Sequence, residues 1–392
     1  MNRSVRESTA RPTLSVITST WPRNPQDITG RFLADLVFAL PLPCEIVCPD
    51  DPEHGLPALP TARLQRFANH GVFYGAGAMG NFASKNVSSV NIARTMTSML
   101  RTALASSRKC DVIFSHWAVP GGLIGALCRR ITSRPHVLLL HSADVYWLEQ
   151  HRSGPAIASF IADHCDALCG VSESIIERFE ALSGRRGRVL GCGVTMPPLS
   201  GTQARRAARV GCLSRFVPGK GLRRLVNVAT SVPGELRIAG AGPLRNELTA
   251  LAHTSGAFHL DGAQVGLDKQ RWLQQLDVFA APFTGMPWGQ PEGLPVSILE
   301  AQAAGLPVVA FEGALPEHLV RDGHNGRLVP QGDWQGFAGV LAELLRDHEQ
   351  RRRLGETARR QVAPYEMGKV AAEWAALFED VASRGRGAPR GC

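Results

Sequence analysis

The stretch Glu292-Gly-Leu-Pro-Val-Ser-Ile-Leu-Glu300 decides the fold of this chain, because it stands between two short apolar runs. The runs 277–281 and 306–311 have the length and composition of buried strands. Pro295 suits the first residue of a helix, where its fixed φ is favourable and its missing N–H is not needed. The helix ends near Ala304, because Gly305 and Pro307 follow. The segment therefore predicts a strand, a helix and a second strand.

Two acids frame this predicted helix. At about 100° per residue, its apolar face contains Val296, Leu299 and Ala303, and Glu300 falls within that face. A carboxylate on a packing face is costly unless a hydrogen bond satisfies it. Glu292 lies in the preceding loop, beside the free N–H groups of the first helical turn. The N-terminus of a helix attracts anions such as phosphate, and the two acids can accept hydrogen bonds from sugar hydroxyls. The alternative is a structural network in which Glu300 pairs with a buried Arg or a backbone amide.

Strands alternate with helical patterns on both sides of this unit. Apolar runs predict strands at 14–19, 45–48, 112–114, 137–140, 167–170, 188–190, 210–213, 236–239, 257–260 and 327–329, whereas 49–85 has no clear pattern. The fold class is therefore α/β, with two Rossmann-like domains facing across a cleft. We predict a first domain over 1–196, a linker over 197–203 and a second domain over 204–365. Residues 366–392 are expected to form a C-terminal helix that packs back towards the first domain, followed by a basic tail.

The chain is basic, with 392 residues, a formal net charge of +9 and a pI near 9.4. This charge favours an anionic membrane surface or an anionic substrate as partner. Nucleic acid is not expected, because no nucleic-acid-binding motif accompanies the charge. No stretch approaches a membrane span or a secretory signal, and the nine cysteines have no disulfide-framework spacing. We therefore expect a cytoplasmic protein with reduced thiols, either free or peripherally bound at the inner face of the cytoplasmic membrane.

A second candidate site follows the predicted strand 210–213. Arg215 and Lys220 flank a glycine-bearing turn that opens a helix, and a diphosphate would find both cations and backbone N–H groups there. Gly240 and Gly242 follow the next predicted strand and permit close backbone approach to a ligand. A solvated loop and a tight structural turn are the respective alternatives.

Polar residues also follow two predicted strands of the first half. His141 and Asp144 come directly after 137–140, and His116 comes directly after 112–114. Parallel sheets bind ligands beyond the carboxyl ends of their strands, so these side chains are expected at the cleft. The alternative is that they are loop residues without a role.

These motifs together resemble retaining glycosyltransferase family 4, which has the GT-B fold, and bacterial exopolysaccharide-assembly members in particular. The resemblance covers roughly residues 13–383. The motifs that carry it are Arg215…Lys220-Gly221, Gly240-Ala-Gly-Pro-Leu244, Glu292…Glu300, Pro316-Glu317, Asn325-Gly326, His116-Trp117-Ala-Val-Pro-Gly-Gly122, His141-Ser-Ala-Asp144, Gly170-Val-Ser-Glu173 and Cys192-Gly-Val194.

The resemblance implies transfer of a sugar from a nucleotide-sugar donor to a lipid-linked or glycan acceptor, with retained anomeric configuration and without metal or cofactor. It implies that Glu292 contacts the hydroxyls of the donor sugar and that Glu300 holds the ribose. Arg215 and Lys220 would neutralise the diphosphate, and His141 would lie near the reacting sugar. Further donor-binding positions are expected at Gly30, Gly240, Gly242, Gly293, Leu294 and Pro295, with His116 and Asp144 near the sugar or acceptor.

The chain departs from the family pattern at several places, including Thr29-Gly30, Ser142-Ala143, Thr195 and Gly313-Ala314. These departures leave the donor and the acceptor position open. Two other functions remain open: a sugar-nucleotide epimerase of the same fold, and a non-catalytic subunit that binds a nucleotide sugar. The donor base, the linkage formed and the oligomeric state are not predicted from the sequence.

Overall fold

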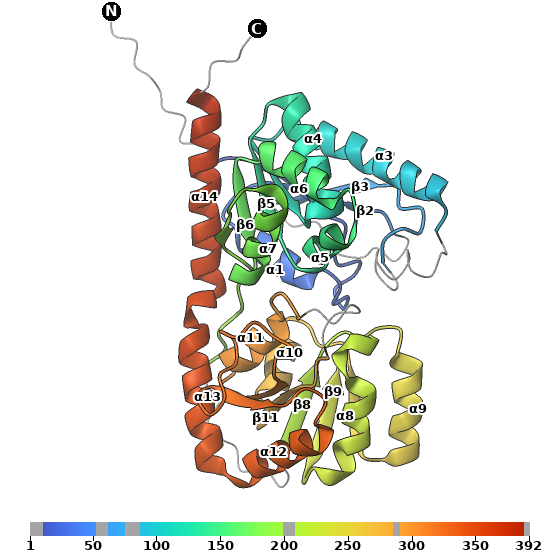
Figure 1. Ribbon diagram of the computed structural model, residues 1–392, viewed down its shortest axis with the longest axis vertical. Helices are drawn as coiled ribbons and strands as arrows, with labels where there is room; N and C mark the ends of the chain where they lie inside the picture. The colour runs from blue at the N-terminus through green and yellow to red at the C-terminus, as the bar shows by residue number, and fades with distance from the viewer. Residues whose placement is uncertain (1–10, 52–61, 75–86, 199–207, 285–290, 388–392) are drawn as a thin grey trace, which may run out of the picture.

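The computed structural model describes residues 11–51, 62–74, 87–198, 208–284 and 291–387. It contains two α/β units, one above the other in Figure 1, each with a fully parallel sheet covered by helices. Most of the predicted linker and the end of the basic tail lie outside the described residues.

The first sheet has seven strands in the order β3-β2-β1-β4-β5-β6-β7. Its strands are β1 Leu14–Ile17, β2 Cys44–Pro49, β3 Ala62–Phe67, β4 Val112–His116, β5 His136–Leu140, β6 Ala167–Gly170 and β7 Arg188–Val189. The helices connecting them are α1 Arg31–Ala39, α3 Ser89–Ser107, α4 Leu123–Thr132, α5 Ala143–Gln150, α6 Gly154–Asp163 and α7 Glu173–Ser183, with a π-helical turn, η1, over Ala118–Gly122.

The second sheet has six strands in the order β10-β9-β8-β11-β12-β13. Its strands are β8 Arg209–Leu213, β9 Glu235–Ala239, β10 Phe258–Gly262, β11 Val278–Ala281, β12 Val308–Phe311 and β13 Gly326–Val329. The helices are α8 Leu222–Val228, α9 Arg245–Ser255, α10 Gly266–Leu273, α11 Val296–Ala303, α12 Trp334–Arg346 and α13 His348–Val362, with 3₁₀ turns η2 Pro218–Lys220, η3 Ala229–Ser231 and η4 Ala363–Tyr365.

The strand–helix–strand unit predicted around residue 295 is confirmed as β11, α11 and β12, and β11 pairs with β12 in parallel. Pro295 is the N-cap with extended backbone, one position before the helix, rather than the first helical residue. The face of α11 that packs inward includes Ile298, Leu299 and Ala303, all fully buried. Local pattern was sufficient here because the helix is bounded by proline and glycine on both sides.

Three local predictions were incomplete. Strand β3 lies within the segment that showed no pattern, because its sequence Ala-Arg-Leu-Gln-Arg-Phe is that of a polar edge strand. Helix α5 was not expected, because it has only about two turns and begins within the motif at 141–144. The helix expected to open at the turn of Arg215 and Lys220 is divided into η2, α8 and η3, and Gly221, with a left-handed φ of 67°, separates η2 from α8.

Each sheet has one topological switch point. In the first sheet the order reverses between β1 and β4, and in the second between β8 and β11. Ligands of doubly wound folds bind outside the carboxyl ends of strands at such points. His116 is the last residue of β4, which runs two residues further than the strand expected from the sequence. Arg215 and Glu292 lie in the loops after β8 and β11, so the topology directs the predicted residues of both units to the switch points.

The two units touch through the loop before α11. Leu294 and Val296 pack against the hydrophobic core of the second unit and also against that of the first. The C-terminal helix α14, Met367–Gly387, runs along the first unit in Figure 1 and buries Trp374 and Phe378 against Phe114. Across the described ranges, no helix has both the length and the apolar composition needed to cross a bilayer.

Candidate active site

A lysine and an acid from different loops of the second unit form the centre of the candidate site. Lys220 Nζ lies 2.8 Å from Glu292 Oε1, and the two side chains are 16% and 15% exposed. The same ammonium lies 4.1 Å from the centre of the Phe283 ring, a cation–π contact. Lys220, which was predicted to bind phosphate, therefore neutralises Glu292, which was predicted to bind the sugar hydroxyls.

Close backbone packing holds Lys220 in this place. Gly221 has a left-handed φ, and a Cβ there would overlap the carbonyl oxygen of Pro282. The N–H of Thr284 also donates to the Gly219 carbonyl at 3.1 Å. The loop after β8 thus lies directly on the chain leaving β11, which brings residues 72 positions apart together.

Arg215 lies near the same acid. Arg215 is an exposed residue, but loss of water around its guanidinium lowers the pKa of Arg215, and the charge of Glu292 opposes this shift. Arginine stays protonated at any physiological pH. The site therefore presents two cations, Arg215 and Lys220, to one acid.

Gly240 and Gly242 lie against the segment that carries Arg215. Both have a positive φ, and a Cβ on Gly242 would come within 2.7 Å of the Phe216 carbonyl oxygen. Phe216 N–H also donates to the Ala241 carbonyl at 2.8 Å. The packing of the two loops therefore requires glycine at positions 240 and 242. This agrees with the alternative of a tight structural turn that the sequence left open.

Glu300 faces inward on α11 and meets a residue that the sequence did not single out. Its Oε1 forms an ion pair with Lys269 of α10, and both side chains are about one-seventh exposed. Asp35 of α1, in the first unit, is close enough for the charges of Lys269 and Glu300 to act on it, and burial raises its pKa. Nothing in the sequence around Lys269 distinguished it from a solvated surface lysine, since Asp268, Gln270 and Arg271 are its polar neighbours.

The predicted residues of the first unit form a compact cluster in which His116 and Asp144 are buried and His141 keeps a partly exposed surface. His116 Nδ1 and His141 Nε2 are 3.3 Å apart, and the His141 ring stacks on Trp117 with centroids 4.5 Å apart. The carboxylate of Asp144 accepts from the N–H of Ala118 at 2.6 Å. Burial raises the pKa of Asp144 to about 6 and lowers that of His141 to about 3, because both ionised forms lose hydration.

Two polar atoms of this cluster have no partner. His116 Nε2 and Asp144 Oδ1 are buried, and neither is hydrogen-bonded to any residue that the structure describes. Burial also lowers the pKa of His116 well below its usual value. Unpaired buried polar atoms cost free energy and are uncommon away from functional sites. The cluster is therefore a candidate for ligand contact.

The two halves of the site meet at Gly293. A Cβ on Gly293 would lie 2.7 Å from Ser142 Cβ and 3.1 Å from the His141 carbonyl oxygen. Leu294 packs on Gly191, and the hydroxyl of Tyr146 donates to the Pro291 carbonyl at 3.1 Å. The loop that carries Glu292 is thus in direct contact with the loop that carries His141.

Gly30 lies farther from these contacts. It is the N-cap of α1 with a φ of 68° and packs against Thr20. Phe32 in the first turn of α1 contacts the rings of Trp117 and His141, so α1 begins beside the histidine cluster. The three atoms nearest to a Cβ built on Gly30 all belong to Thr20 of the first unit.

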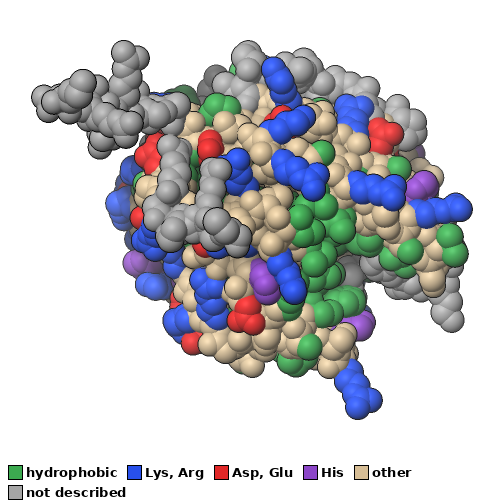
Figure 2. All heavy atoms as spheres, turned by 90° about the horizontal axis from the view of Figure 1, so that it is seen from above, with side chains coloured by type: hydrophobic (Ala, Val, Ile, Leu, Met, Phe, Trp, Pro, Cys, Tyr) green, Lys and Arg blue, Asp and Glu red, His purple; other side chains and the backbone are tan. Residues whose placement is uncertain are grey.

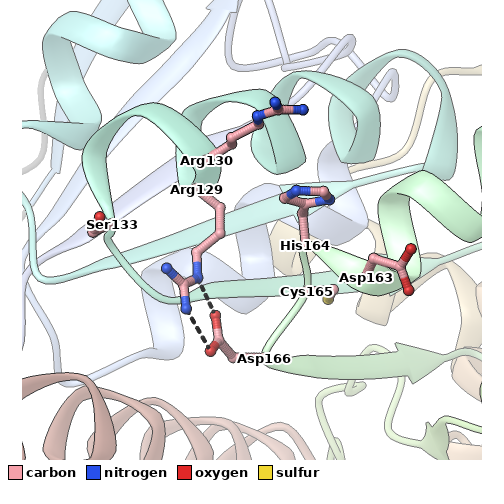
Figure 3. Close-up of a pocket in the computed structure, with 7 residues that line it drawn as sticks. All are labelled: Arg129, Arg130, Ser133, Asp163, His164, Cys165 and Asp166. Carbon is pink, nitrogen blue, oxygen red and sulfur yellow. Dashed lines mark hydrogen bonds and ion pairs between the residues drawn. The ribbon is translucent and has the colours of Figure 1, made fainter. Parts of the chain in front are cut away.

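Figure 3 shows a surface depression on the first unit, at the ends of α4 and α6. Its lining residues are Arg129, Arg130, Ser133, Asp163, His164, Cys165 and Asp166. None of the candidate site residues belongs to it, and Arg129 is already paired with Asp166 at 2.8 Å. This depression is therefore separate from the candidate active site.

No cluster of potential metal ligands is found among the described residues. The eight cysteines within the described ranges are free and buried, as expected for apolar strand and core positions. Burial raises the pKa of Cys165 and Cys48 to about 12, so both remain thiols at neutral pH.

Comparison with known proteins gives two family matches. Residues 22–193 match the model of the glycosyl transferase 4-like domain, and residues 207–347 match that of glycosyl transferases group 1. Together the two matches span most of both units.

Individual proteins are similar over longer or shorter stretches. A GDP-mannose-dependent α-(1-6)-phosphatidylinositol monomannoside mannosyltransferase of Mycolicibacterium smegmatis is 29% identical over 67% of this chain and 76% of its own length. A lipopolysaccharide core biosynthesis glycosyltransferase of Rhizobium meliloti is 34% identical, but over only 37% of this chain and 41% of its own length. Among solved structures, the Anabaena protein HepE in complex with UDP-glucose superposes with a TM-score of 0.72 at 16% identity, covering 94% of this chain and 100% of HepE.

Proposed function

Because the chain belongs to the family 4 type of glycosyltransferases and has their GT-B fold, we propose that it transfers a sugar from a nucleotide-sugar donor to a lipid-linked or polysaccharide acceptor. We further propose that the reaction retains the anomeric configuration, needs no metal and serves the biosynthesis of cell-surface polysaccharide or glycolipid. The observation that carries the proposal is the contact of the Glu292–Leu294 loop with His141-Ser142, beside the Lys220–Glu292 pair.

The relatives support a nucleotide-sugar donor and a membrane-associated acceptor. The mannosyltransferase is named for GDP-mannose and a phosphatidylinositol mannoside, and HepE was solved with UDP-glucose. We propose a donor of this chemical class, a nucleoside diphosphate linked to a hexose. A lipid-linked acceptor would place the protein at the cytoplasmic face of a membrane.

The charges of the site suit the departure of a diphosphate. When the bond between the anomeric carbon and the phosphate oxygen breaks, the electron pair stays on the diphosphate, and its charge grows. Lys220 and Arg215 would stabilise that charge more strongly in the transition state than in the ground state. Lys220 would then exchange Glu292 for phosphate, which frees Glu292 to accept hydrogen bonds from the donor sugar.

We propose attack from the same face as the leaving group. The acceptor hydroxyl forms the new bond at the anomeric carbon as the old bond breaks, and its proton passes to an oxygen of the departing diphosphate. No side-chain nucleophile is required by this route. His141, which would lie near the reacting sugar, stays neutral because burial lowers its pKa to about 3, and it acts as a hydrogen-bonding group rather than a cation.

The test is transfer kinetics of Glu292→Gln, Arg215→Ala and Lys220→Ala. A thermal-shift screen with UDP, GDP and ADP sugars first identifies the donor, since a bound ligand stabilises the folded state. Each variant should lose on the order of 100-fold or more in kcat/KM. Arg223→Ala serves as control, because Arg223 is exposed near Lys220 but pairs with Glu247.

Undiminished transfer in all three variants would refute the site. Formation of an epimer without acceptor would instead identify an epimerase, and donor binding without turnover across a broad acceptor panel would identify a binding subunit.

A further inference from the structure

Helix α3 presents a row of arginines to solvent. Arg94, Arg101 and Arg108 are exposed and spaced seven residues apart, so they follow one face of the helix and its C-cap. The row is about 21 Å long at the rise of an α-helix. Residues 89–107 contain no acid at all. The charge on the exposed face of α3 is therefore positive, with no acid on the helix to offset it.

The neighbouring helix extends this charge. Helices α3 and α4 lie side by side in Figure 1 and share a hydrophobic cluster that includes Met99 and Cys128. Arg129 is paired with Asp166, but Arg130 points in a different direction in Figure 3. Lys109 is exposed next to Arg108. We call Arg94, Arg101, Arg108, Lys109 and Arg130 the basic face.

The basic face lacks compensating acids. Residues 89–135 contain seven Lys and Arg but a single acid, Asp111, which lies 4.0 Å from Arg134. No side chain of the basic face forms an ion pair with an acid in the described parts of the chain. Figure 2, which looks onto this end of the molecule, shows many more Lys and Arg side chains than Asp and Glu, with hydrophobic side chains among them.

Two large apolar side chains stand at the ends of the basic face. Val90, one turn before Arg94, is 58% exposed, and Ile131, next to Arg130, is 55% exposed. Exposed apolar side chains among unpaired cations match a surface whose outer layer is anionic and whose interior is hydrocarbon. An acidic polysaccharide or a nucleic acid would satisfy the charges but would leave Val90 and Ile131 in water.

We propose that the basic face docks on an anionic lipid bilayer. This proposal deepens the proposed function and rests on its lipid-linked acceptor. Helix α3 ends where β4 begins, and β4 runs towards the candidate site, so the first turn of α3 lies at the carboxyl edge of the sheet. A bilayer on this face would therefore adjoin the side of the first unit from which His116 and His141 reach the cleft.

The test measures binding of the full chain to vesicles of mixed phosphatidylglycerol and phosphatidylcholine, by sedimentation. The variant Arg94→Gln/Arg101→Gln/Arg108→Gln should bind on the order of 100-fold more weakly, since each basic side chain near an anionic surface contributes roughly fivefold. The matched control is Arg346→Gln/Arg353→Gln/Arg360→Gln, which removes the same charge from exposed positions on α12 and α13. The control should bind as the parent does.

Binding of the parent should also disappear on vesicles of phosphatidylcholine alone and weaken in high salt. Equal loss of binding in the control triple variant, or unchanged binding in the α3 triple variant, would overturn the proposal. Binding of the parent to dextran sulfate without binding to vesicles would overturn the proposal and would indicate a site for soluble polyanions.

Measuring sugar transfer to a water-soluble acceptor tests the proposed function independently of membrane docking. The α3 triple variant should keep that transfer, because none of its three residues touches the candidate active site. Absence of transfer in the parent would reject the proposed function, while vesicle binding would still report on the basic face.

Discussion

At the scale of single residues, the candidate site is already electrostatically paired without ligand. Lys220 neutralises Glu292, and Lys269 neutralises Glu300. Both acids are mostly buried, so removing either lysine would leave a carboxylate that is poorly hydrated and unpaired. The two ion pairs keep the charged side chains ordered without leaving a buried charge unpaired. A bound donor can take over these contacts, with its phosphates on the lysines and its hydroxyls on the acids.

Asp144 gives a prediction about pH. Its pKa of about 6 lies above the ordinary value of 3.8, so between these values the folded state keeps a proton that the unfolded state has lost. The free energy of unfolding therefore falls by up to about 3 kcal/mol as pH rises from about 4 to 6. Asp144→Asn removes this titration. The variant should gain on the order of 2–3 kcal/mol relative to the parent between pH 4 and pH 7.

Urea denaturation at a series of pH values measures this difference. His141 acts in the opposite direction, because its lowered pKa makes the folded state lose stability as pH falls from 6.5 towards 3. His141 is present in both proteins, so its effect cancels in the comparison. Parallel stability curves for parent and variant would contradict the assignment of the raised pKa to Asp144.

At the scale of elements, the loop into α11 joins the two units. Leu294 and Val296 contribute to both hydrophobic cores, and Tyr146 of α5 donates to the Pro291 carbonyl. The loop therefore couples the position of Glu292 to the position of the first sheet. A substitution that alters the contact of this loop with the first unit should therefore lower activity more than the free energy of unfolding.

Gly293→Ala tests that coupling. The new Cβ would stand 2.7 Å from Ser142 Cβ, so the loops must separate. Because small displacements of reacting groups are costly, kcat/KM should fall on the order of 10–100-fold with little change in melting temperature. Adding Ser142→Gly should restore much of the loss, since it removes the side chain that the Cβ meets.

Ser142→Gly alone is the control and should be nearly neutral, because the Ser142 side chain makes no capping hydrogen bond to α5. Additive losses in the double variant would show that the two residues do not act through their contact.

At the scale of the whole molecule, α14 completes the first unit with residues from the C-terminal end of the chain. Trp374 is fully buried, contacts Phe114 and Phe378, and donates from its indole N–H to the Gly191 carbonyl at 2.9 Å. The core of the first unit therefore depends on a helix that follows the second unit in sequence.

Trp374→Ala should destabilise the first unit by about 3–5 kcal/mol, because it leaves a large cavity and an unpaired carbonyl. Urea unfolding followed by fluorescence measures the change. Trp374→Phe should cost less, since it keeps an aromatic ring between Phe114 and Phe378. A loss that appears instead in the transition of the second unit, where Trp272 and Trp334 report, would contradict this packing.

The sequence by itself determined the alternation of strands and helices, because apolar periods and the prolines and glycines at element ends are local properties. It also placed His141, Arg215 and Glu292 after strands, which puts them at the carboxyl edges of the sheets. It missed β3, whose polar side chains give no apolar period, and it did not distinguish Lys269 from a solvated lysine.

Only the tertiary structure decided which of these residues meet. Lys220 and Glu292 are 72 positions apart, Gly293 touches Ser142 from the other unit, and Trp374 closes a core that begins with β1. Each contact depends on how two separately formed sheets and a late helix pack together. That packing is set by surfaces far apart in the chain, so no local pattern in the sequence records it.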